Sequence, residues 1–93
     1  MPLQGYEVIN TTVSETIDNT GRVEAFVYAP SGKKPIGGGG FVFSADGFFA
    51  GSAPFSEEVN GQEQWVGWNA YGRTHSTSPV TVAVDVYMIC VNG

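Results

Sequence analysis

Charge is scarce in this sequence, and positive charge scarcest of all. Charged residues make up 14% of the 93 positions, and nine acidic residues stand against four basic ones. Affinity for nucleic acid comes mainly from Lys and Arg side chains that neutralise phosphates. Four scattered bases and a net charge of −5 therefore argue against a nucleic-acid partner and against an anionic membrane surface. Such a charge-poor surface is typical of a protein that neighbours cover.

Long apolar runs are missing as well. No window approaches the ~20 apolar residues that cross a membrane, so we expect no membrane span. The first residues have neither the basic start nor the apolar stretch of a signal peptide, so we expect the chain to be made in, and stay in, the cytoplasm unless a particle carries it out.

Reactive side chains are few and isolated. Cys90 is the only cysteine, which excludes an internal disulfide, and its apolar neighbours in the sequence predict a small buried side chain. His75 is the only histidine, and no nucleophile motif accompanies it. No carboxylates cluster at the spacing of metal ligands. We therefore predict no catalytic residue, no metal, no cofactor and no enzymatic activity.

Helix-forming stretches are nearly absent, and the segments present are typical of β-structure. Short runs of β-branched and aromatic residues alternate with turn signals such as Asp46-Gly47 and Asn60-Gly61. At this length one hydrophobic core is the limit. We expect a single all-β domain over residues 1–93, an antiparallel sandwich or barrel of about six strands. The expected strands are 6–13, 23–29, 36–44, 48–53, 64–71 and 80–91, with Asp46-Gly47 as a hairpin turn and 54–63 and 72–79 as polar loops.

The segment 80–91 carries the clearest pattern. Every second residue from Val80 to Cys90 is apolar, which predicts one fully buried face of a strand. The opposite face begins polar and then becomes apolar, so its second half needs another cover, from a sheet or from a second subunit. The candidate interface residues are Tyr87, Ile89 and Val91 on this face, with Phe41 and Phe43 after the glycine run.

Four consecutive glycines, Gly37 to Gly40, invite comparison with a phosphate-binding loop. Such a loop ends in Gly-Lys-Ser/Thr, whereas this run leads into the strand-like Phe41-Val42-Phe43. The run therefore predicts the start of a strand, where the backbone twists or packs closely against a neighbour.

A second group of candidates gathers around two tryptophans. On a strand, Trp65 would share a face with Asn69 and Tyr71, while Trp68 would lie on the other face. Such aromatic rings can stack on a sugar, with amide and guanidinium groups as hydrogen-bond partners. Equally, one Trp can fill the core and the other cover a sheet face or an interface. The alternative function is thus a carbohydrate-binding module for surface glycans, with candidate ligand-stacking residues Trp65, Trp68, Asn69, Tyr71 and Arg73.

Short motifs run in a fixed order through most of the chain. They are G-Y-E-V at 5–8, P-S-G-K-K at 30–34, G-G-G at 37–39, S-A-P at 52–54, W-N at 68–69 and the segment 82–90. In this order they resemble a small Gly-rich β-domain of actinobacterial proteins and their phages, which in phages often follows collagen-like repeats in tail fibres. The resemblance implies a non-enzymatic virion component that is oligomeric, with a trimer favoured, and whose partners are capsid or tail proteins.

The chain departs from that family pattern in two ways. The resemblance implies a cysteine at the position of Ala29, paired with the one at Cys90, and here the bridge is missing, which suits a reducing cytoplasm. The collagen-like repeats are missing too, so we expect a free-standing product with its own attachment surface. The expected function is a virion structural protein, first of all a capsid decoration (cement) protein, with a tail-fibre tip as the near variant.

Overall fold

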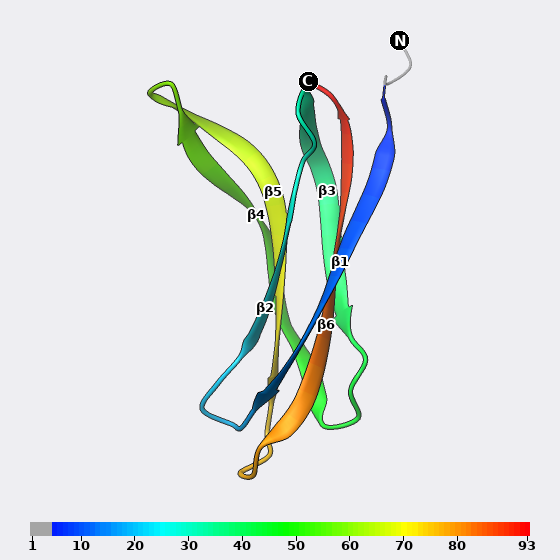
Figure 1. The fold of residues 1–93 in the computed structure, drawn as a ribbon, viewed down its shortest axis with the longest axis vertical. Helices are drawn as coiled ribbons and strands as arrows, with labels where there is room; N and C mark the ends of the chain where they lie inside the picture. The colour runs from blue at the N-terminus through cyan, green and yellow to red at the C-terminus, as the bar shows by residue number, and fades with distance from the viewer. Residues whose placement is uncertain (1–4) are drawn as a thin grey trace.

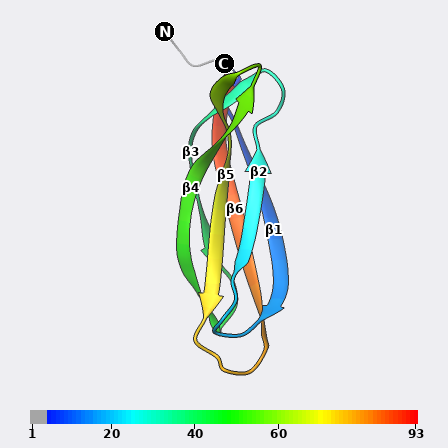
Figure 2. The ribbon, with the colours of Figure 1, turned by 90° about the vertical axis from the view of Figure 1, so that its left-hand side faces the viewer.

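The computed structural model describes residues 5–93 and contains six β-strands in two antiparallel sheets. Sheet A has the order β1 (Glu7–Ile17), β6 (Val80–Asn92) and β3 (Lys33–Val42). Sheet B has the order β2 (Val23–Tyr28), β5 (Gln62–Thr74) and β4 (Gly47–Val59). The two sheets lie face to face as the layers of a sandwich (Figures 1 and 2). The expected all-β fold is confirmed as an open sandwich rather than a closed barrel.

The chain changes sheet at every connection except one. Only β4 and β5 follow each other within a sheet, and their turn has positive φ at Asn60 (53°) and Gly61 (80°), as hairpin turns of two residues require. The hairpin expected at Asp46-Gly47 is wrong, because β3 and β4 belong to different sheets. That segment instead crosses between the layers through a turn in which the Gly47 N–H donates to the Ser44 carbonyl at 3.2 Å.

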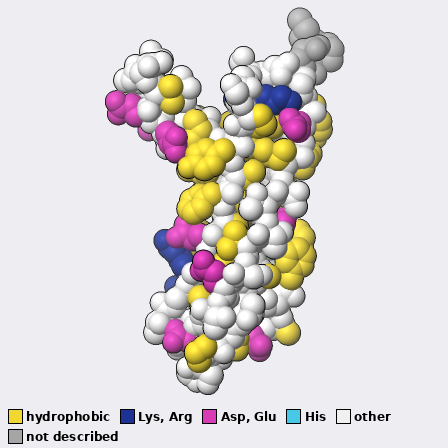
Figure 3. Space-filling view, in the orientation of Figure 1, with side chains coloured by type: hydrophobic (Ala, Val, Ile, Leu, Met, Phe, Trp, Pro, Cys, Tyr) yellow, Lys and Arg dark blue, Asp and Glu magenta, His cyan; other side chains and the backbone are white. Residues whose placement is uncertain are grey.

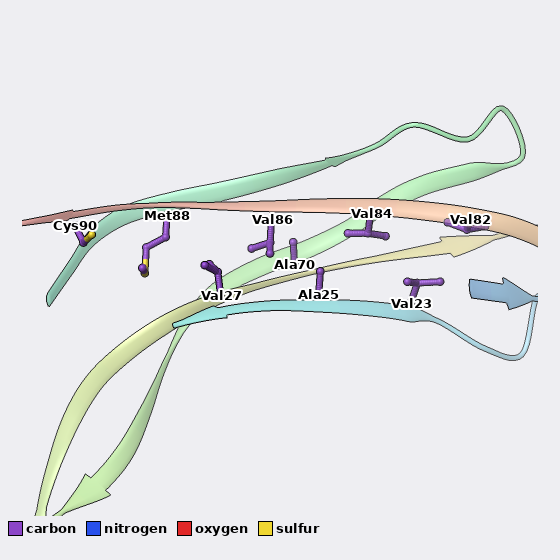
Figure 4. Packing of buried hydrophobic residues seen from close by; sticks show 9 residues of the cluster. All are labelled: Val23, Ala25, Val27, Ala70, Val82, Val84, Val86, Met88 and Cys90. Carbon is purple, nitrogen blue, oxygen red and sulfur yellow. The ribbon is translucent and has the colours of Figure 1, made fainter. Parts of the chain in front are cut away.

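The core lies between the two central strands. The alternating residues of β6 are fully buried and meet residues of β2 and β5 across the sandwich (Figure 4). Each such side chain contributes ~1.5–3 kcal/mol when it leaves water. The face predicted from the period-two pattern is thereby confirmed, and Cys90 is a buried packing residue within it. The cluster consists of Val23, Ala25, Val27, Ala70, Val82, Val84, Val86, Met88 and Cys90.

The glycine run allows the two layers to approach closely. A Cβ at Gly40 would lie 2.6 Å from the Cβ of Ala70 and would also collide with the backbone carbonyl of Asp85. A Cβ at Gly38 would lie 2.7 Å from the ring of Trp68. Real Cβ atoms do not come this close to other heavy atoms, so the interior positions of the run need glycine. The expected close backbone packing is confirmed, but the run lies inside β3 and not at the start of a strand.

The largest difference between expected and observed strands is at residues 54–63. The sequence predicts a polar loop there, but β4 continues to Val59 and β5 starts at Gln62, so the segment is a hairpin. The last β2–β5 pair is Tyr28 with Gly67, and beyond it β4 and β5 pair only with each other. We call residues 56–65 the arm, and Figure 1 shows it leaving the body of the sandwich. Because almost every arm residue faces solvent, the sequence shows no alternation there.

Candidate interaction surfaces

The outward side of sheet A, here the sheet A face, carries the candidate interface residues. The rings of Phe41 and Phe43 meet edge to face at 4.5 Å, and the two side chains are 48% and 56% exposed. Tyr87, paired with Gly39 on the neighbouring strand, is 37% exposed. Ile89 and Val91 share this side of β6, but Ile89 is half-buried and Val91 is only 2% exposed.

The apolar area of this face extends onto β1. Val8 pairs with Ile89 in the register of β1 and β6, and its side chain is 56% exposed. The glycines of β3 leave room for the neighbouring strand, since a Cβ at Gly39 would lie 2.8 Å from the Tyr87 hydroxyl. The sheet A face is therefore a broad surface of apolar and aromatic side chains that residues 5–93 leave uncovered.

One carboxylate lies within this face, and it is covered. Asp85 is 4% exposed, and its Oδ1 accepts hydrogen bonds from the Thr12 hydroxyl at 2.8 Å and from the Asn10 amide at 3.1 Å. Both donors are neutral, and within residues 5–93 no Lys or Arg forms an ion pair with this carboxylate. The charge is thus satisfied within the chain and hidden from a partner.

The outward side of sheet B is aromatic as well, but it carries exposed charges. The ring of Phe55 meets Phe26 at 5.7 Å and Tyr28 at 5.0 Å, both edge to face. Nearby, Arg22 forms an ion pair with Glu24 at 2.7 Å, and both side chains are partly exposed. This side is therefore less suited than the sheet A face to a dry apolar contact.

The candidate ligand-stacking residues do not form one site. Trp68 lies on the inner side of β5, against Gly38 of sheet A, and its Nε1 is buried with no hydrogen-bond partner among the described residues. Trp65 is 55% exposed and sits in the arm, beyond a register shift of β4 against β5. The other three ligand-stacking candidates lie on the outward side of sheet B, because side chains alternate between the two faces along β5. They are Asn69, Tyr71, which lies 5.2 Å from the guanidinium of Arg22, and Arg73, which donates to the Asn19 carbonyl at 3.2 Å.

A cleft of about 480 Å³ opens between the arm and the body. Gln64 and Trp65 belong to its arm wall, and Lys33 and Lys34 belong to its body wall. Figure 3 shows the hollow between the projecting arm and the body. The ammonium group of Lys33 lies 2.7 Å from the Glu7 carboxylate, whereas Lys34 has no carboxylate at ion-pair distance within residues 5–93.

The arm has the opposite charge. Its ionisable residues are Glu57, Glu58 and Glu63, and the register places Glu58 directly opposite Glu63. Like charges directly opposite each other destabilise an antiparallel pair. Glu57 accepts a hydrogen bond from the Tyr28 hydroxyl at 3.1 Å, and this bond, together with the negative charge, raises the pKa of Tyr28. The opposed pair Glu58–Glu63 has no cation beside it in the described part of the chain.

Titratable side chains form no metal-binding cluster among residues 5–93. His75 is exposed, and its ring stacks on that of Phe48 with centroids 4.4 Å apart. At the turn between β1 and β2, the Thr20 hydroxyl and backbone N–H donate to the Asp18 carboxylate and lower its pKa. These groups have local structural roles, and the absence of enzymatic activity stays a prediction.

Comparison of the chain with known protein families, with curated proteins and with solved structures finds no match. The described residues contain no helix long and apolar enough to cross a membrane. Proposals on function therefore rest on the surfaces of the sandwich and its arm and on the resemblance carried by the sequence motifs.

Proposed function

We propose that this protein is a non-enzymatic structural component of a phage particle, first of all a capsid decoration protein, with a tail-fibre tip as the near variant. It adds no chemistry and stabilises the particle by binding its neighbours. The observation that carries the proposal is the sheet A face, where Phe41, Phe43 and Tyr87 are exposed around a covered carboxylate. The resemblance to the Gly-rich β-domain of phage proteins supports the virion as the setting.

The energetics of this face favour assembly. Aromatic side chains bury ~150–250 Å² each in a core or interface. Covering the exposed parts of Phe41, Phe43 and Tyr87 would remove roughly 300 Å² from water, which is about 7 kcal/mol before the costs of association. Copies with a net charge of −5 repel one another, but the centre of this face presents no exposed carboxylate, since Asp85 is covered. Electrostatic repulsion between two copies is therefore weakest for contact through this face.

The edges of the sheets offer a second means of attachment. β1 and β3 are the outer strands of sheet A, and each has one side without a strand partner in the described chain. Such edges can pair with a strand of a neighbouring subunit through main-chain hydrogen bonds. A decoration protein that combines a dry face with edge pairing locks neighbouring capsomers together without any reaction.

The test uses the mass of the pure protein by light scattering and its co-sedimentation with capsids of the phage that encodes it. The wild type is expected to form oligomers and to sediment with the capsids. The double variant Phe41→Ser/Phe43→Ser should lose co-sedimentation with the capsids, while Phe26→Ser, on the outward side of sheet B, should retain it. A protein that stays a single chain and sediments with neither capsids nor tails contradicts the proposal.

A second candidate function, carbohydrate binding, is favoured by one observation. Trp65 is 55% exposed in a cleft that also contains Gln64, a combination of a flat aromatic surface and an amide. The expected partners Asn69 and Arg73 lie elsewhere, so a glycan would have to use the cleft residues. Glycan-array binding that disappears in Trp65→Ala, with the fold intact, supports this function, and no signal at millimolar glycan dismisses it.

A further inference from the structure

The arm lacks the support that every strand of the body has. Residues 56–65 pair only within their own hairpin, with Ser56 opposite Trp65 and Val59 opposite Gln62. A two-stranded hairpin alone is marginally stable in water. Two bonds hold its base to β2 and the residue after it, from the Tyr28 hydroxyl to Glu57 and from the Ala29 N–H to the Val66 carbonyl at 2.8 Å. Further contact is needed to hold the rest of the arm in place.

The charges of the arm indicate what kind of contact this is. Glu58 and Glu63 face each other across the hairpin, and their repulsion would be relieved by a cation placed between or beside them. The described chain has four basic residues, and three already have polar partners. Arg22 pairs with Glu24, Arg73 donates to Asn19, and Lys33 pairs with Glu7.

Lys34 is the remaining base, and it lies in the cleft beside the arm. Within residues 5–93 of a single chain, no carboxylate comes within ion-pair distance of Lys34, although the arm forms the other wall of the same cleft. The complementary charges are thus present in one molecule but do not meet in it. They can meet when an arm enters the cleft of a neighbouring molecule.

We infer that the arm of one copy docks in the cleft of a second copy, with Glu58 and Glu63 beside Lys34. The inference rests on the assembly part of the proposed function and names its contact. Trp65 lines the cleft and Val59 lies next to the tip of the arm, so each contact also buries apolar surface. Trp is the residue type most enriched at the energetic centre of interfaces. Because arm and cleft are different surfaces, the contact closes reciprocally between two copies or around a ring.

Charge reversal with mixing provides the test. In the arm-reversed variant Glu58→Lys/Glu63→Lys and in the cleft-reversed variant Lys34→Glu, like charges meet at every arm-to-cleft contact. Each variant alone is expected to associate at least about tenfold more weakly than the wild type, and light scattering should report single chains. In an equimolar mixture each arm finds a cleft of opposite charge on the other variant, so a pair or an even-numbered ring should recover the wild-type mass. The triple variant Lys34→Glu/Glu58→Lys/Glu63→Lys restores opposite charges at every contact and should recover it in a ring of any number.

The controls separate this contact from a loss of folding and from other occupants. The arm-reversed variant keeps two like charges opposite each other, so the internal repulsion of the arm is matched, and circular dichroism checks the fold. Wild-type mass in either variant alone, or recovery in neither the mixture nor the triple variant, overturns the inference. Recovery in the triple variant but not in the mixture indicates a ring with an odd number of copies, whereas a wild-type protein that stays a single chain overturns the inference.

The outcome is distinguishable from failure of the proposed function. If the charge variants keep the wild-type mass while Phe41→Ser/Phe43→Ser loses capsid binding, the arm contact is wrong and the structural role stands. If the charge variants and their mixture behave as expected but the protein does not bind capsids or tails, the arm contact stands and the virion role is wrong.

Discussion

The body of the sandwich and the arm differ in what lies behind their strands. In the body, β6 has a strand on each side and a second sheet behind it, and its inner row from Val82 to Cys90 is fully buried. In the arm, β4 and β5 have only each other, and residues 57–59 and 62–65 are all exposed. Identical antiparallel pairing is therefore backed by the core in one region and rests almost wholly on the hairpin itself in the other.

In the proposed assembly, this difference separates stability from recognition within one small domain. Burial in the body supplies the free energy of folding. The arm and the sheet A face carry side chains that folding of the single chain leaves exposed. Amide hydrogen exchange should follow the same division, with slow exchange in β6 and fast exchange in the arm of the single chain. The variants below test the division, from the largest expected effect to the smallest.

The largest effect is expected from cutting the core. Met88 is fully buried in the inner row, so Met88→Ala leaves a cavity and should lower the free energy of unfolding by about 3 kcal/mol. Val59→Ala, at the tip of the arm, should lower it by less than ~0.5 kcal/mol, because its side chain has few neighbours to lose. Urea denaturation of both variants gives the comparison, and equal costs would show that the arm is part of the core.

The sequence predicts the body well for a physical reason. A strand with one buried face has an apolar residue at every second position. The inner row of β6 and the apolar outer residues Tyr87 and Ile89 are therefore recognisable from the order of the amino acids alone. The sequence of the arm shows no such alternation, because both faces of the arm meet solvent and its composition is that of a loop. Asn60-Gly61 is visible as a turn signal, and extending strands from it would place Glu58 opposite Glu63.

Other features depend on long-range arrangement and have no local signal. Asp46-Gly47 has the residues of a hairpin turn, yet the chain uses the segment to cross between layers. Lys34 and Trp65 lie about thirty positions apart in the sequence, and only the departure of the arm from the body places both in one cleft. The carboxylate of Asp85 belongs by its sequence to a polar face, and its cover by Thr12 follows from the register of β1.

The close approach of the two layers in the body can be tested within the glycine run. Gly40→Ala places a methyl group 2.6 Å from Ala70 and against backbone, so we expect a loss of about 2 kcal/mol of unfolding free energy. Gly37→Ala is the matched control, since its methyl group would lie 3.9 Å from Ile89, an ordinary contact. Equal stability of the two variants in urea denaturation would contradict the close packing of the layers.

Removing a carboxylate should have opposite effects in the two regions. Asp85→Ala leaves the Asn10 amide and the Thr12 hydroxyl without their acceptor, and both donors reach solvent, so we expect a loss of about 1 kcal/mol. Glu63→Gln removes a like-charge pair and should stabilise the arm by about 0.3 kcal/mol. Denaturation reports the first variant. Slower amide exchange in the arm, at dilutions where the protein is a single chain, reports the second, and faster exchange there would contradict the repulsion.

The smallest effect concerns the bond between the body and the base of the arm. The Tyr28 hydroxyl donates to Glu57, and that bond and the adjacent negative charge raise the pKa of Tyr28 above its ordinary value of 10.0. Because the folded pKa is the higher one, the contribution of this bond to stability is fully present below pH 10.0 and is lost as the pH rises through the folded pKa of Tyr28. NMR titration of ring-labelled tyrosine should show the Tyr28 pKa falling towards its ordinary value in Glu57→Gln and unchanged in Glu63→Gln. An identical Tyr28 pKa in the wild type and in Glu57→Gln would mean that the arm is not tied to β2 through this side chain, which leaves the bond from the Ala29 N–H to the Val66 carbonyl as the link at its base.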